Sequence, residues 1–128
     1  MKLFNRKKND TIIIVGCGRF GADLAMTSPN QRQNVTVIDI NSSAFHNLPE
    51  SYCGFSIEGD GLDMNTLEAA GILCADVLIA AMDDDNANLM IAQIAKQHYK
   101  IGLVIARIYD ESKRVSCDKT GIETICPV

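Results

Sequence analysis

The spacing of three glycines and one acidic residue is the feature of this sequence that points most directly to a chemical function. Gly16, Gly18 and Gly21 form the pattern G-x-G-x-x-G immediately after the apolar run 11–15, and Asp39 closes the next apolar run. Such glycines let a tight turn bring its backbone close to a pyrophosphate, and an acid roughly 20 residues later accepts hydrogen bonds from ribose hydroxyls. The pattern predicts a site for a phosphate-linked adenosine.

Asp39 constrains the identity of the ligand. A 2′-phosphate on the ribose would meet the like charge of this carboxylate, which disfavours NADP. NAD(H), AMP, ADP and ATP share the unmodified ribose, and the residues leave the choice among them open. An alternative interpretation makes Asp39 an acid that caps a helix after its strand. Arg19, inside the glycine turn, is expected either to clamp a phosphate or to be solvated.

Other candidate residues follow the later apolar runs. Asp60 and Gly61, in the segment 58–61, are expected beside the adenine, with a plain polar turn as the alternative. Asp84 or Asp85 is expected to cap the helix that follows, because three consecutive acids cannot all converge on one metal ion. The full set of predicted ligand-binding residues is Gly16, Cys17, Gly18, Arg19, Phe20, Gly21, Asp39, Ile40, Asp60, Gly61, Ala81, Met82 and Arg107.

Six short apolar runs position these residues. They occupy residues 11–15, 35–38, 52–57, 77–81, 103–106 and 122–125. Four of the six are nearly continuous in Ile, Val, Leu and Ala, which is typical of strands buried on both faces of a parallel sheet. With helices between the strands, they predict a single-domain α/β fold, a Rossmann-like doubly wound sheet of six parallel strands in the order 3-2-1-4-5-6. Arg107 ends the fifth run and is expected to point toward the crevice at the strand ends, or toward an acid there.

Helix boundaries follow from caps and breakers. The first helix is expected to end near residues 28–29, where a proline stands. Ser42 or Ser43 is expected to cap a short second helix, and Asp63 a third that closes at Gly71. The fourth helix is marked by a stripe at helical spacing, formed by Ala87, Met90, Ile91, Ile94, Ala95 and His98.

Composition narrows the class of protein. The chain has 128 residues, 47% of them hydrophobic, and a net charge of −4. Residues 1–10 form a basic arm, expected to be a solvated terminus or a contact for an anionic membrane or acidic partner. The acidic remainder does not suit a nucleic-acid binder. No run is long enough to span a bilayer, and the five scattered cysteines, without a C-x-x-C pair, favour reduced thiols in the cytosol over zinc ligands.

The sequence lacks the second half of a typical dehydrogenase. Hydride transfer requires a wall that binds substrate and supplies an acid or base. The two histidines, His46 and His98, do not stand beside expected strand ends. We therefore expect a domain that binds and senses a nucleotide. A small NAD-dependent oxidoreductase, or one half of one, is the enzymatic alternative, and an assembly module with an empty pocket is the third.

A set of ordered motifs resembles a known family. The segments 16–21, 37–39, 59–61, 76–80, 85–88, 105–107 and 121–122 resemble the N-terminal RCK (KTN) domain of Trk- and Ktr-type potassium uptake systems and some potassium channels. The resemblance covers residues 11–128 and implies a nucleotide-binding regulatory domain, without enzymatic activity. It also implies that Gly16, Gly18, Arg19 and Gly21 contact the phosphates, with Asp39 at the ribose, Asp60 near the adenine, and Arg107 near the phosphates or a subunit interface.

The same resemblance implies an assembly. Family members form dimers that build a cytoplasmic ring, octameric in its full form, against the inner face of the membrane beneath a potassium transporter or channel subunit. Exchange of NADH for NAD, or of ATP for ADP, changes the shape of that ring. The chain stops at Val128, before the C-terminal ligand-binding domain that family members commonly carry. We therefore expect either a separately encoded regulatory partner chain or a longer parent protein.

Overall fold

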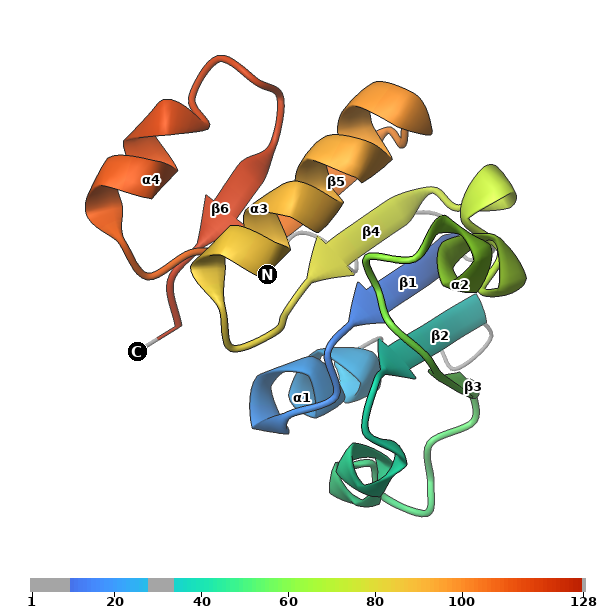
Figure 1. Cartoon of the computed structure of the whole chain (residues 1–128). Helices are drawn as coiled ribbons and strands as arrows, with labels where there is room; N and C mark the ends of the chain where they lie inside the picture. Colours follow the sequence, from blue (N-terminus) through green and yellow to red (C-terminus); the bar gives the residue numbers. More distant parts are fainter. Residues whose placement is uncertain (1–9, 28–33, 128) are drawn as a thin grey trace.

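A twisted sheet of six parallel strands forms the centre of the computed structural model, which describes residues 10–27 and 34–127 (Figure 1). The strands are β1 (Thr11–Val15), β2 (Asn34–Asp39), β3 (Phe55–Glu58), β4 (Val77–Ala80), β5 (Leu103–Arg107) and β6 (Glu123–Ile125). Their order is β3-β2-β1-β4-β5-β6, and every neighbouring pair is parallel. The predicted fold class and strand order are confirmed. The predicted arm, apart from Asp10, and the predicted end of the first helix lie outside the described residues.

Helices cover both faces of the sheet (Figure 1). They are α1 (Arg19–Met26), α2 (Met64–Ala69), α3 (Asp85–Gln93) and α4 (Glu111–Ser116), with 3₁₀ turns η2 (Ser42–Asn47) and η3 (Ile72–Cys74) and a π-helical turn, η4 (Ile94–His98), that continues α3. Successive residues of β1 face opposite cores, as the pleat requires. Ile12 and Ile14 pack with α1, whereas Ile13 and Val15 pack with α2 and α3. This double burial explains the continuous apolar runs.

The third strand differs from its prediction, because β3 begins at Phe55 rather than at residue 52. The hydroxyl of Tyr52 lies 3.1 Å from the main-chain oxygen of Val35 and 2.7 Å from that of Phe55. Tyr52 therefore crosses the end of the strand instead of extending it. None of the helices in the described part of the chain combines the length and hydrophobicity that crossing a bilayer requires.

Helix α3 and the turn η4 bury part of the predicted stripe, including Ile91 and Ala95, but not Met90. Met90 is 52% exposed, whereas Asn88 is fully buried beside Ile91 and Ala92. The prediction placed Met90 on the stripe because of its apolar character, but Asn88 is held inside by hydrogen bonds to two loops. Among the caps, Asp63 on α2 and Asp84 on α3 are confirmed, while the prediction of Ser42 or Ser43 is wrong. The side chain of the preceding Asn41 caps η2 by accepting from the Ser43 N–H.

Candidate functional site

A cavity of about 240 Å³ opens at the carboxyl ends of the strands. It is lined by Val15, Gly16, Gly18, Ile38, Asp39, Ile40, Gly59, Asp60, Gly61, Ala81, Met82 and Asp83. These residues follow β1, β2, β3 and β4, and the strand order reverses between β1 and β4. Open parallel sheets bind ligands at this point. The structure thus gathers eight of the predicted site residues around one cavity, from Gly16 to Met82.

The three glycines of the turn after β1 differ in what a side chain at each position would contact. Gly16 has a φ of +111°, and a Cβ there would lie 2.7 Å from the carbonyl oxygen of Ala81. A Cβ on Gly21 would collide with the carbonyl oxygen of Gly16, so α1 packs directly against the turn. A Cβ on Gly18 would meet nothing within 4 Å, because this residue borders the open cavity. No described side chain caps the N-terminus of α1, which leaves its first N–H groups available to an anion.

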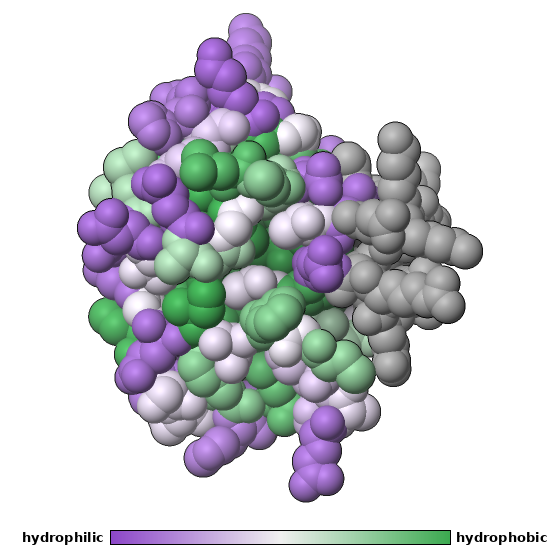
Figure 2. Space-filling view, turned by 90° about the vertical axis from the view of Figure 1, so that its right-hand side faces the viewer, coloured by the Kyte–Doolittle hydropathy of each residue, from purple (hydrophilic) through white to green (hydrophobic). Residues whose placement is uncertain are grey.

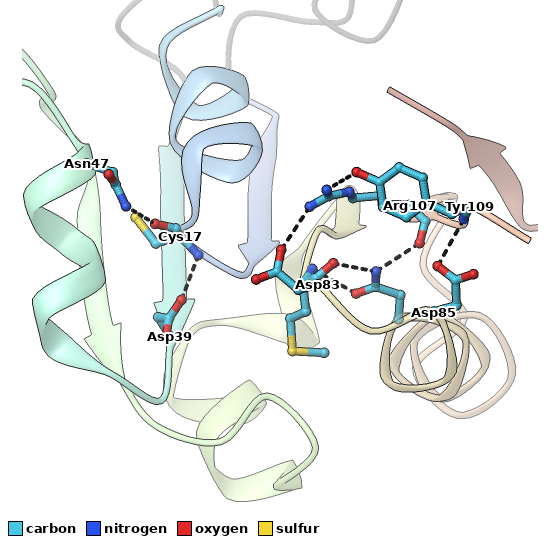
Figure 3. A network of polar contacts seen from close by, with 9 residues as sticks. Cys17, Asp39, Asn47, Asp83, Asp85, Arg107 and Tyr109 are labelled. Carbon is cyan, nitrogen blue, oxygen red and sulfur yellow. Dashed lines mark hydrogen bonds and ion pairs between the residues drawn. The ribbon is translucent and has the colours of Figure 1, made fainter. Parts of the chain in front are cut away.

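Asp39 borders the cavity beside the glycine turn, at the end of β2. Its Oδ2 accepts from the main-chain N–H of Cys17 at 2.8 Å (Figure 3). Its Oδ1 accepts from the main-chain N–H of Asn41 at 2.9 Å. Each carboxylate oxygen keeps further lone-pair capacity, so the group can also accept from ribose hydroxyls. Because Asn41 caps η2, the alternative of Asp39 as the helix cap is wrong.

The segment after β3 forms the third wall. The N–H of Gly59 donates to the main-chain oxygen of Asp39 at 2.9 Å, which ties this segment to the end of β2. Asp60 accepts from the N–H of Leu62 at 2.9 Å, and a Cβ on Gly61 would collide with Val15. The segment is a polar turn that also borders the cavity.

Asn88 is a site residue to which sequence reasoning assigned no role. Its amide accepts from the N–H of Met82 at 2.8 Å and donates to the main-chain oxygens of Met82 and Arg107 at 2.9 and 2.8 Å. Because Asn88 is fully buried and these bonds satisfy it, it fixes the loop after β4 against the end of β5. The sequence signal that could have identified Asn88 is its position, as a polar residue, on the buried stripe of α3.

Five predicted site residues do not line the cavity. Cys17 and Gly21 are buried behind the turn, and Arg19 is exposed at the start of α1. The Arg107 guanidinium lies 5.3 Å from the ring centroid of Phe20 and 4.7 Å from that of Tyr109. The expectation that Arg107 points toward an acid is confirmed, because its Nη1 lies 3.3 Å from Asp83 (Figure 3).

The thiol nearest the site, that of Cys17, is buried away from solvent. Burial, and secondarily the charge of Asp39, raise the pKa of Cys17 to about 11, which keeps this thiol protonated at neutral pH. Within residues 10–27 and 34–127, no group of three or more His, Cys, Asp or Glu side chains is placed to hold a metal ion. The arrangement is suited to binding a phosphate-linked adenosine through main-chain N–H groups and one carboxylate.

Comparisons with protein-family models and with individual sequences give matches that agree with each other. The model of the TrkA-N domain matches residues 12–127. A Trk system potassium uptake protein TrkA from Streptomyces coelicolor is 37% identical over 117 residues, covering 91% of this chain and 52% of the relative. A TrkA homolog from Methanothermobacter thermautotrophicus is 32% identical over 114 residues, covering 89% and 52%. The chain spans about half the length of these relatives.

Solved structures share the fold. The Shewanella denitrificans Kef CTD in its AMP-bound form has a TM-score of 0.71 and 25% identity, covering 91% of this chain and 72% of that one. The TrkA-N domain of the inner membrane protein ybaL from Escherichia coli has a TM-score of 0.78 and 18% identity, covering 92% and 87%. The GsuK channel bound to NAD has a TM-score of 0.74 and 16% identity, covering 91% and 21%. The last two likenesses concern the fold alone.

Proposed function

The chain belongs to the TrkA-N domain family, and we propose that it is a regulatory nucleotide-binding domain of a potassium transport system. Residues 11–128 form the domain, which binds NAD(H) or an adenine nucleotide (AMP, ADP or ATP) in the cavity at the strand ends. It acts in the cytoplasm, at the inner face of the membrane, on a potassium transporter or channel subunit. The relatives from Streptomyces and Methanothermobacter are named as potassium uptake proteins, which supports this partner.

The observation that carries the proposal is the placement of Asp39 beside the glycine turn, with both bordering one cavity. In this arrangement the carboxylate accepts from the ribose hydroxyls, while the uncapped start of α1 and the turn at Gly18 receive the phosphate. Asp60 and Gly61 border the remaining wall and lie beside the adenine. The Kef CTD solved with AMP supports an adenosine ligand.

Asp39 also accounts for selectivity between the two nicotinamide cofactors. Both of its oxygens already accept from main-chain N–H groups, which hold the carboxylate in place. A 2′-phosphate would bring a second anion against this fixed charge. NADP therefore binds more weakly than NAD.

A binding role fits the lining better than a catalytic one. The ionisable side chains that border the described cavity are Asp39, Asp60 and Asp83. His46 and His98 are exposed and border other surfaces. A carbonyl reductase would need an acid or base beside the nicotinamide, commonly His or Lys. The domain thus senses its ligand, and conductance changes only if the ligands favour different conformations of the assembly.

Self-association is part of the proposal. Several large apolar side chains are exposed, among them Ile40, Phe55, Leu73 and Val115. Figure 2 shows apolar and near-neutral residues interspersed across the middle of one face, with hydrophilic residues at its top, left and bottom edges. Apolar surface of this kind is typical of contacts between subunits. We propose dimers that assemble into a ring, and light scattering of the purified chain tests this part.

Equilibrium titration of the chain with NADH, NAD, AMP, ADP, ATP and NADP tests the nucleotide site. We expect micromolar binding of at least one of the first five, and NADP binding weaker than NAD by about tenfold. Absence of binding to all of them would contradict the proposal. Mass spectrometry of gently purified protein identifies any retained nucleotide, and loss of NADH absorbance with a carbonyl substrate would favour the oxidoreductase instead.

A further inference from the structure

A largely buried cation stands just outside the cavity, behind an exposed carboxylate. The side chain of Arg107 is 14% exposed and does not line the cavity, whereas that of Asp83 is 96% exposed and does. Their closest atoms, Arg107 Nη1 and Asp83 Oδ1, are 3.3 Å apart. Asp83 therefore separates the guanidinium from whatever anion occupies the cavity.

The guanidinium is held in place mainly by rings. It lies within cation–π distance of the rings of Phe20, at the start of α1, and of Tyr109. It also donates to the Tyr109 hydroxyl (Figure 3). Aromatic faces stabilise a cation without using its N–H donors. Its Nε is buried and has no hydrogen-bond partner among the described residues. A guanidinium has five N–H donors, and the contacts of Nη1 with Asp83 and of Nη2 with Tyr109 use two of them, so Arg107 retains donor capacity in the planar form that suits phosphate oxygens.

Hydrogen bonds hold the main chain around the Arg107–Asp83 ion pair, but the ion pair itself separates easily. Asn88 fixes the main chain of Met82, the neighbour of Asp83, to the carbonyl group of Arg107. The Asp83 side chain has no such restraint. An ion pair with one fully solvated partner contributes little to stability. Moving this carboxylate aside thus costs little and leaves the backbone of the site unchanged.

We propose that Asp83 and Arg107 together determine how strongly the site distinguishes adenine nucleotides by the number of their phosphates. This inference rests on the proposed nucleotide site. Gly18 and Asp83 border the same cavity, so phosphates added beyond the one at the turn extend toward Asp83. The negative charge of Asp83 repels these phosphates, and its carboxylate pairs with Arg107. When Asp83 is displaced, Arg107 exchanges its carboxylate partner for a phosphate.

The test compares AMP, ADP and ATP titrations of the unaltered chain with those of Asp83→Asn. We expect Asp83→Asn to raise the affinity for ADP and ATP roughly fivefold, because repulsion and competition for Arg107 are both removed. The affinity for AMP stays nearly unchanged. Asp118→Asn, which removes one exposed charge far along the chain after α4, serves as the matched control and should leave the three affinities in their original ratio.

A second variant tests the cation. In the Asp83→Asn background, Arg107→Lys keeps the charge but loses the planar fork, and should cancel most of the gain for ADP and ATP. Thermal unfolding of each variant identifies any that fails to fold. If Asp83→Asn changes all three affinities equally, or lowers those for ADP and ATP, the inference is wrong although the nucleotide site stands. If the unaltered chain binds no nucleotide, the proposed function itself fails.

Discussion

The carboxylate of Asp39 accepts a hydrogen bond from the main-chain N–H of Cys17, with 2.8 Å between Oδ2 and N. These residues are 22 positions apart, and the bond joins the end of β2 to the glycine turn after β1. The acid proposed to recognise the ribose therefore also holds the turn proposed to receive the phosphate. The two recognition elements form one unit.

Replacement of Asp39 tests this unit. Asp39→Asn keeps one acceptor oxygen but loses the charge, so we expect binding of NAD or AMP to weaken by about 1–3 kcal/mol. The preference for NAD over NADP should narrow at the same time, because the repulsion of the 2′-phosphate disappears. Titration calorimetry measures both, with Asp118→Asn as the control for net charge. Unchanged affinity would remove Asp39 from the ligand site.

Two alanine substitutions in the glycine turn should separate folding from binding. Gly21→Ala places a Cβ against the carbonyl oxygen of Gly16 and should lower the free energy of unfolding by about 3 kcal/mol. Gly18→Ala meets no atom within 4 Å and has an ordinary φ of −72°, so its stability should stay within about 0.5 kcal/mol. Its methyl group nevertheless enters the cavity and should weaken nucleotide binding. Urea unfolding and titration of both variants decide this.

Asn88 should be among the costliest polar side chains to remove. Asn88→Ala leaves the buried N–H of Met82 and two carbonyl oxygens without their partner, and we expect a loss of about 3 kcal/mol of unfolding free energy. The matched control is Asn86→Ala, two residues earlier on α3, where the side chain is exposed. Equal effects of the two substitutions in urea unfolding would refute the role given to Asn88.

Asp85 should make the free energy of unfolding depend on pH. Desolvation raises its pKa, but the N–H groups of Tyr109 and Asp110, both at 2.9 Å, outweigh this and hold the pKa below its ordinary value of 3.8. The stabilisation is therefore present above that value and is lost as the pH falls through the lower pKa of the folded state. Asp85→Asn should destabilise the chain at about pH 7, with a smaller difference at about pH 3. A constant difference in the urea midpoints would contradict this.

The thiols should react in two groups. Cys53, Cys74 and Cys126 are exposed, whereas Cys17 and Cys117 are buried. At about pH 8 a thiol reagent should label the exposed three quickly and the buried two only after unfolding. Because the pKa of Cys17 rises from 9.0 to about 11 on folding, its contribution to stability is present below 9.0 and is lost as the pH rises toward 11. Cys17→Ala should flatten that alkaline decline.

The predictions that succeeded depend on neighbours along the chain. The alternation of apolar runs and helices, the caps Asp63 and Asp84, and the neighbouring positions of Gly16, Gly18 and Asp39 follow from local patterns. A parallel sheet brings the carboxyl ends of its strands to one edge. Residues that follow the strands therefore meet there, whatever the details of the packing.

The predictions that failed depend on contacts between distant segments. Local hydropathy placed Met90 inside, but three hydrogen bonds to the loops after β4 and at the end of β5 bury Asn88 instead. Of the two directions expected for Arg107, the crevice or an acid, the contacts with Phe20 and Asp83 in the folded chain selected the acid. Periodicity carries no information on such partners, since each polar group settles where the folded chain supplies matching donors, acceptors or rings. Tertiary packing therefore decided which charged side chains border the cavity, and local sequence decided where the cavity lies.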